Sequence, residues 1–132
     1  MQVAVWDTYV KTANGSVMHF DIVLPETVKD TALIYGYGRQ YLETKGVQNA
    51  ELSASECRYC HIEEPTALMM AAIEEKGFYI IEMETIAAQL PATPTRRDKI
   101  LFLRAHFPQH RFAQFSGMPE AEIDDLITKA WV

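Results

Sequence analysis

The chain has 132 residues, a formal net charge of −6 and a hydrophobic content of 48%. This content excludes a disordered chain, and the length is typical of one domain or of one domain with an appendage. Residues 1–90 contain six basic and thirteen acidic residues, so they repel nucleic acid and anionic membranes, and we expect neither as a partner. The sequence has no run of about eighteen apolar residues and does not begin like a signal peptide, so we expect a cytoplasmic protein.

The first stretch of the chain predicts a β-hairpin. Residues 2–10 are apolar and rich in β-branched side chains, and Asn14-Gly15 is a strong signal for a tight turn. Residues 17–24 then alternate along a second strand. Met18, Phe20, Ile22 and Leu24 share one face of this strand, and Val17, His19, Asp21 and Val23 share the other.

A helix is expected next, with Thr27 or Asp30 as its cap, and it should run to about Lys45 before Gly46. Its apolar stripe consists of Leu33, Tyr37 and Tyr41, widened by Ile34 and Leu42. Gly36 and Gly38 weaken a helix by about 1 kcal/mol each relative to alanine. We expect these two glycines to allow close packing of the helix on the sheet.

Residues 57–83 predict a strand, a helix and another strand. Residues 57–63 are expected to be extended, and Pro65 suits the first turn of a helix that ends at Gly77. The inner face of this helix should consist of Leu68, Met69, Ala72, Ile73 and Lys76. Residues 78–83 are apolar on both sides, which favours a central strand. The order β-β-α-β-α-β predicts an α+β fold, a four-stranded sheet with its helices on one face.

The pattern divides the chain into an α+β domain (1–88), a linker (89–95) and a helical extension (96–132). The extension should contain three helices, one to about His106, one from Gln109 to Phe115 and one from Pro119 to Ala130. A helix-turn-helix is an alternative for residues 112–126, but the recognition helix would then present four acidic side chains to phosphates. We therefore expect the extension to pack, or to contact a protein partner or a second copy of the chain.

Cys57-Arg58-Tyr59-Cys60-His61 is the stretch most suggestive of chemistry. It matches the attachment pattern of c-type haem, but covalent attachment requires export, so we do not expect haem. A redox pair is a second interpretation; it requires a lowered thiol pKa, which the neighbouring Glu56 and Glu63 oppose. A third is a zinc site formed by Cys57, Cys60, His61 and His19, which requires the stretch to turn so that both sulfurs converge.

Two further interpretations need no convergence of the cysteines. In the first, the stretch is extended, Cys60 is a buried small hydrophobic residue and Cys57 is an ordinary thiol. In the second, side chains gather on the open face of the sheet as a general base or ligand cluster. The members of that cluster would be Asp7, His19, Asp21, His61 and Glu63.

Several stretches in matching order resemble a family of small bacterial proteins known as domain of unknown function 2024. They are Val5–Val10, Met18–Ile22, Glu56–Glu63 and Glu74–Met83, and the resemblance covers about residues 1–86. It implies a small sheet of about four strands with two helices, and it implies no activity. Members of the family end soon after the fourth strand, so the resemblance does not explain residues 90–132.

We therefore expect a non-enzymatic binding or protein-interaction module that associates with a protein partner or with itself. The alternative is a zinc-binding or thiol-dependent protein that uses Cys57, Cys60 and His61 with His19.

Overall fold

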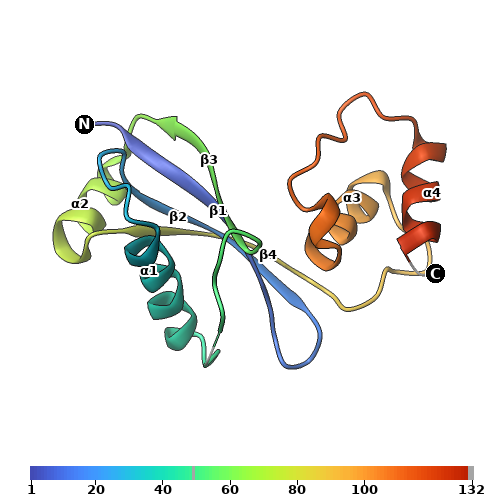
Figure 1. The fold of residues 1–132 in the computed structure, drawn as a ribbon, viewed down its shortest axis with the longest axis horizontal. Coiled ribbons are helices and arrows are strands. Elements are labelled where there is room, and N and C mark those ends of the chain that lie inside the picture. The colour runs from blue at the N-terminus through green and yellow to red at the C-terminus, as the bar shows by residue number, and fades with distance from the viewer. Residues whose placement is uncertain (49, 131–132) are drawn as a thin grey trace.

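The computed structural model describes residues 1–48 and 50–130. In chain order its elements are β1 (Val3–Lys11), β2 (Val17–Pro25), α1 (Thr31–Thr44), β3 (Cys57–Glu63), α2 (Ala67–Lys76), β4 (Tyr79–Ile86), α3 (Arg96–His106), a 3-10 helix (Pro108–His110) and α4 (Glu120–Ala130). The strands form an antiparallel sheet in the order β3-β1-β2-β4. The predicted α+β class and element order are confirmed. Figure 1 shows α1 and α2 at one end of the molecule and α3 and α4 at the other.

The β1–β2 hairpin forms the centre of the sheet, and its register creates two different faces. Ala4 lies opposite Leu24 and Thr8 opposite Phe20 on what we call the first face, whereas the second face carries pairs such as Asp7 opposite Asp21. The alternation predicted along β2 is confirmed, because Phe20, Ile22 and Leu24 belong to one core cluster and Val17 and Val23 belong to others.

Helix α1 covers the first face. Asp30 caps it by accepting hydrogen bonds from the backbone N–H groups of Ala32 and Leu33. A Cβ atom at Gly38 would lie 2.5 Å from Leu52 Cδ1, which confirms the expected close packing at this glycine. The predicted stripe was wrong at one edge: Leu33 is 42% exposed. The buried positions of the helix are Ile34, Gly38 and Leu42.

Helix α2 covers the opposite face, so the prediction that the helices share one face was wrong. Met69 of α2 is buried in a cluster with Val3, Val5 and Val23, all on the second face. The cause is the hairpin itself, which exposes apolar side chains on both of its faces at this end and therefore needs a cover on each. Leu68, expected on the inner side of α2, is 71% exposed.

Strand β4 lies at an edge of the sheet and not at its centre as predicted, since it pairs with β2 and β3 pairs with β1. Its apolar character has another source. Ile80 packs against the α1 cluster on the first face, and Tyr79 and Ile81 pack against the α2 cluster on the second. An edge strand that helices cover on both faces has the same apolar pattern as a central one.

The C-terminal helices rest on the far end of the second face. Ala105 of α3 is buried with Tyr9, Val17 and Ile86 of the sheet. A separate core joins α3 to α4 through Leu103, Phe115 and Ile123. The expected helix from Gln109 to Phe115 is reduced to the 3-10 turn Pro108–His110, because Pro108 ends α3 and the following residues form turns. The first helix of the helix-turn-helix alternative is therefore missing from this part of the chain.

Arg111 fastens the C-terminal segment to the rest of the molecule. Its guanidinium donates to the carbonyls of Arg104, Ala105 and Ser55 at 3.1, 2.8 and 2.7 Å, and the residue is only 8% exposed. Since Ser55 precedes β3, these bonds tie the extension to the sheet.

Within 1–48 and 50–130, no helix combines the length and apolarity needed to cross a membrane.

Candidate functional site

Three ionisable side chains meet at the centre of the second face: Asp7 from β1 and His19 and Asp21 from β2, here called the polar cluster. The register explains their meeting, because Asp7 lies directly opposite Asp21 and residues 19 and 21 point to the same side of β2. One ligand atom from each residue lies within 4.8 Å of the others. The cluster lies between the end of the face covered by α2 and the end covered by α3.

His19 is the most constrained member of the cluster. Its Nε2 lies 2.5 Å from Asp7 Oδ1, and its ring stacks on Tyr9 with centroids 4.2 Å apart and planes 7° from parallel. The residue is 9% exposed. Its Nδ1 is buried and has no hydrogen-bond partner among the described residues. The ring is thus fixed in place, with Nε2 in contact with Asp7 and with Nδ1 unpartnered among the described residues.

The surroundings of Asp21 disfavour the charged form of its carboxyl group. Burial raises the pKa of Asp21 to about 7, and the charge of Asp7 and a hydrogen bond to it add to this rise, whereas His19 and His61 oppose it. Like charges placed directly opposite each other in a sheet are destabilising. In the described part of the chain, neither carboxylate forms an ion pair with a lysine or arginine; the one pair, between Asp7 and His19, is within the cluster.

The two cysteines lie in different surroundings, and which of them is buried is the reverse of what the sequence predicts. Cys57 lies opposite Thr8 on the first face, is 1% exposed and accepts a 3.3 Å hydrogen bond from Thr8 Oγ1. Cys60 is exposed, because the register of β3 shifts around it and breaks the strict alternation of sides. The interpretation with Cys60 buried and Cys57 at the surface was therefore wrong.

Both thiols are poor candidates for redox chemistry. Burial raises the pKa of Cys57 to about 11. Neighbouring atoms partly desolvate the exposed thiol of Cys60 and, with the charges of Asp7 and Asp21, also raise its pKa. A reactive thiolate needs a lowered pKa, so the geometry supplies the opposite of what a redox pair requires.

The four residues predicted to bind zinc do not converge. Cys57 is in the core of the first face, whereas His19 is on the second, and His61 lies beside Glu63 at 3.5 Å with half of its side chain exposed. The cluster prediction fared better: its members Asp7, His19 and Asp21 do meet. His61 and Glu63 lie farther along β3, opposite Val5 and Val3. The alternation of β2 carried the correct signal for His19 and Asp21.

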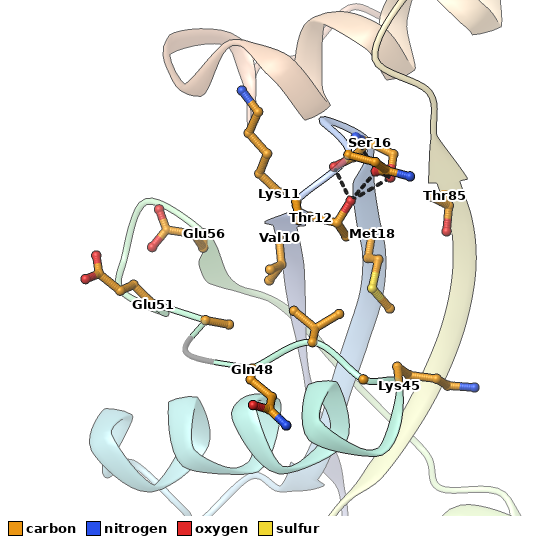
Figure 2. Close-up of a pocket in the computed structure, with 15 residues that line it drawn as sticks. Val10, Lys11, Thr12, Ser16, Met18, Lys45, Gln48, Glu51, Glu56 and Thr85 are labelled. Atoms are coloured by element: carbon orange, nitrogen blue, oxygen red, sulfur yellow. Dashed lines mark hydrogen bonds between the residues drawn. The ribbon is translucent and has the colours of Figure 1, made fainter.

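Another hollow, with a volume of about 1020 Å³, lies between the β1–β2 turn and the loop after α1. Figure 2 shows the residues that line it. Its polar turn groups bond to one another: Thr12 Oγ1 donates to Asn14 Oδ1 at 2.6 Å, and the backbone N–H of Ser16 donates to the same oxygen at 3.0 Å. These groups hold the turn in shape. The described lining has no cluster of metal ligands, so the polar cluster is the stronger candidate.

A smaller cavity, of about 300 Å³, separates β3 from the C-terminal segment and touches the polar cluster at Asp7. Arg58, Cys60, Arg104 and Arg111 line it. Sequence reasoning did not predict this cavity, because its arginines come from elements distant in the chain and only the packing of the extension brings them together.

Comparison with known proteins places the sheet in a family. The NMR structure of protein NE1680 from Nitrosomonas europaea is 38% identical, with a TM-score of 0.57; the match covers 64% of this chain and 96% of that one. Nearly all of that protein thus corresponds to about two thirds of this one. No curated protein matches the chain. The model of the family described as Domain of unknown function (DUF2024) matches residues 1–83, and the chain belongs to this family.

Proposed function

We propose that the α+β domain is a metal-binding module that holds a divalent cation with Asp7, His19 and Asp21. One observation carries this proposal: three ligand atoms from two adjacent strands lie within 4.8 Å of one another on a rigid sheet. Two carboxylates and one imidazole are donors that suit zinc, manganese or ferrous iron. A strand pair also positions ligands more accurately than a loop does.

Two features of the surroundings support a cation at this point. The facing carboxylates of Asp7 and Asp21 repel each other, and a cation between them would replace that repulsion with attraction. The imidazole of His19 is already oriented by its stacking on Tyr9, so little side-chain entropy is lost when it binds. Protons compete with a cation for Asp21, whose pKa is raised to about 7, so the affinity should fall as the pH falls.

Of the residues expected from the sequence to bind zinc, the proposed site includes His19, and its other ligands are carboxylates instead of cysteines. Cys57 is buried on the other face of the sheet, and Cys60 lies beside the cluster without belonging to the group of three. A cytoplasmic location belongs to the same proposal, because both cysteines are free thiols, as is usual in reducing compartments.

Metal titration of the EDTA-treated, untagged protein tests the proposal. Isothermal titration with zinc, manganese and ferrous salts should show one site per chain for at least one of them. Asp7→Asn, His19→Gln and Asp21→Asn should each weaken that site by tenfold or more, whereas His110→Gln, which changes a histidine outside the cluster, should not. Absence of stoichiometric binding, or equal weakening by the control, would contradict the proposal.

Self-association is a second candidate, favoured by the exposed edge of β3. Tyr59 and Ile62 of this strand are 46% and 40% exposed, and β3 has a neighbour on one side only. Apolar side chains on an open edge are suited to contact with a second copy of the chain. Sedimentation should then show a dimer that Ile62→Glu dissociates; a wild-type monomer at about 100 μM, a concentration that populates micromolar dimers, would exclude it.

A further inference from the structure

The cavity between β3 and the C-terminal segment concentrates positive charge in a protein whose net charge is −6. Its walls carry the guanidinium groups of Arg58, Arg104 and Arg111 against the single carboxylate of Asp7. We call it the arginine cavity. An excess of positive charge, partly shielded from solvent, attracts anions far more strongly than the same charges on an open surface.

The arginines of this cavity differ from the other basic residues of the extension. Arg96, Arg97, Lys99 and Lys129 all form ion pairs with carboxylates. Arg58, Arg104 and Arg111 form none with the residues that the structure describes, and the three of them share the cavity with one carboxylate, that of Asp7. Of the three, Arg111 already uses three of its five N–H donors on backbone carbonyls, so we assign it a contribution of charge to the cavity.

Arg58 and Arg104 retain donors that a ligand can use. Arg104 spends one N–H on the carbonyl of Ala113 at 3.2 Å, and the guanidinium of Arg58 has no hydrogen bond within the described residues. Each is held by an aromatic ring, Arg58 over Phe112 at 5.2 Å and Arg104 over Phe115 at 5.3 Å. A guanidinium held over a ring in this way presents a planar fork that matches two oxygens of a carboxylate or phosphate.

We propose that the arginine cavity binds a small molecule with a carboxylate or phosphate group, whose oxygens accept hydrogen bonds from Arg58 and Arg104. The cavity volume of about 300 Å³ is at the lower end of ligand pockets, which selects a small molecule and not a polymer. This site uses arginines that take no part in the proposed metal site, although its ligand lies beside Asp7 and thus beside the polar cluster.

The proposal gives the C-terminal extension a function. Arg104, Arg111 and Phe112 lie outside the segment that the family model matches, and that segment supplies only the β1 and β3 walls of the cavity. Oxyanion binding is therefore a property that the extension adds to the family's sheet, through the packing of α3 and the fastening bonds of Arg111.

Titrations with inorganic phosphate and with succinate test the proposal and distinguish the two ligand classes; they use protein that has been treated with EDTA and then dialysed free of it, at low ionic strength. One of them should bind saturably at one site, and Arg58→Gln and Arg104→Gln should each weaken binding at least tenfold. Arg39→Gln is the matched control, since it removes the same charge from the exposed surface of α1. Equal weakening by Arg39→Gln would show general charge attraction and overturn the proposal.

A second measurement needs no variant and so does not depend on the variants folding. During the same titration of the wild-type protein, the backbone amide NMR signals of Cys60 and Gln114, which line the cavity, should shift together along one saturation curve. Shifts confined to other parts of the chain, or linear drift without saturation for both probes, would also overturn the proposal.

Discussion

Asp21→Asn should stabilise the metal-free protein at pH 7.5 and leave its stability nearly unchanged at pH 4. Burial and the proximity of Asp7 raise the pKa of Asp21 from 3.8 to about 7. The folded chain therefore holds a proton between about pH 4 and pH 7 that the unfolded chain has released. Because the folded state binds more protons across this window, its stability falls as the pH rises. An asparagine mimics the neutral acid and removes that loss.

The magnitude follows from the same shift. A rise from 3.8 to about 7 sets an upper limit of about 4 kcal/mol, since one pKa unit corresponds to about 1.4 kcal/mol. Solvent reaches part of the Asp21 carboxyl and screens the charges, so we expect about half of this limit, about 2 kcal/mol at pH 7.5. For a chain of this size, that corresponds to roughly 8 °C in melting temperature.

Urea unfolding in EDTA, followed by tryptophan fluorescence at both pH values, checks this prediction. Asp125→Asn is the control: Asp125 forms an exposed pair with Lys129, and its loss should change stability by less than about 0.5 kcal/mol. If Asp21→Asn destabilises the protein at pH 7.5, the carboxylate makes favourable contacts and the reasoning fails. A stabilisation of equal size at pH 4 and pH 7.5 would refute its electrostatic origin.

Three further predictions concern the fold. Gly38→Ala should be about 1–3 kcal/mol less stable than Gly36→Ala in urea unfolding. Both variants gain the same helix propensity, so this gain cancels in the comparison, and only at position 38 does the new Cβ lie 2.5 and 3.1 Å from core atoms. Equal stabilities would contradict the close packing. In the native protein, Ellman's reagent should modify Cys60 and should reach Cys57 only when the protein unfolds. The folded Cys57→Ser variant should therefore show one reactive thiol, and the folded Cys60→Ser variant should show none; a reactive thiol in folded Cys60→Ser would contradict the burial of Cys57. Arg111→Ala should lower the free energy of unfolding by about 3 kcal/mol. Arg111→Lys should lose most of the same stability, because an ammonium group cannot donate to three carbonyls in these fixed directions. A loss below about 1 kcal/mol in the urea unfolding of the alanine variant would show that these bonds do not fasten the extension.

The features that the sequence predicts are those set by local patterns. Asn14-Gly15 marks the hairpin, and the alternation after it places His19 and Asp21 on one face, which in turn fixes two of the three residues of the polar cluster. The close approach at Gly38 is likewise a local requirement of helix-on-sheet packing. These inferences need no knowledge of the tertiary arrangement.

The features that the sequence misses depend on contacts between distant segments. The shift of register at Cys60 reverses the expected sides of the two cysteines, and no residue type in the stretch marks a bulge. The edge position of β4 and the placement of α2 depend on which strand pairs with β2. The arginine cavity depends on the packing of the extension against the sheet, through Ala105 and through the bond from Arg111 to the carbonyl of Ser55.

Long-range ¹H–¹⁵N NMR of the imidazole rings during a zinc titration tests the central claim of metal binding most directly. The chain has four histidines, and His19 is the one in the polar cluster. Our account predicts that a ring nitrogen of His19 shifts to a metal-bound position and saturates at one equivalent of zinc, while the other three histidines stay unchanged. Saturating shifts at His61 with none at His19 would contradict it, and so would an unchanged His19 ring together with no binding of manganese or ferrous iron in the isothermal titration.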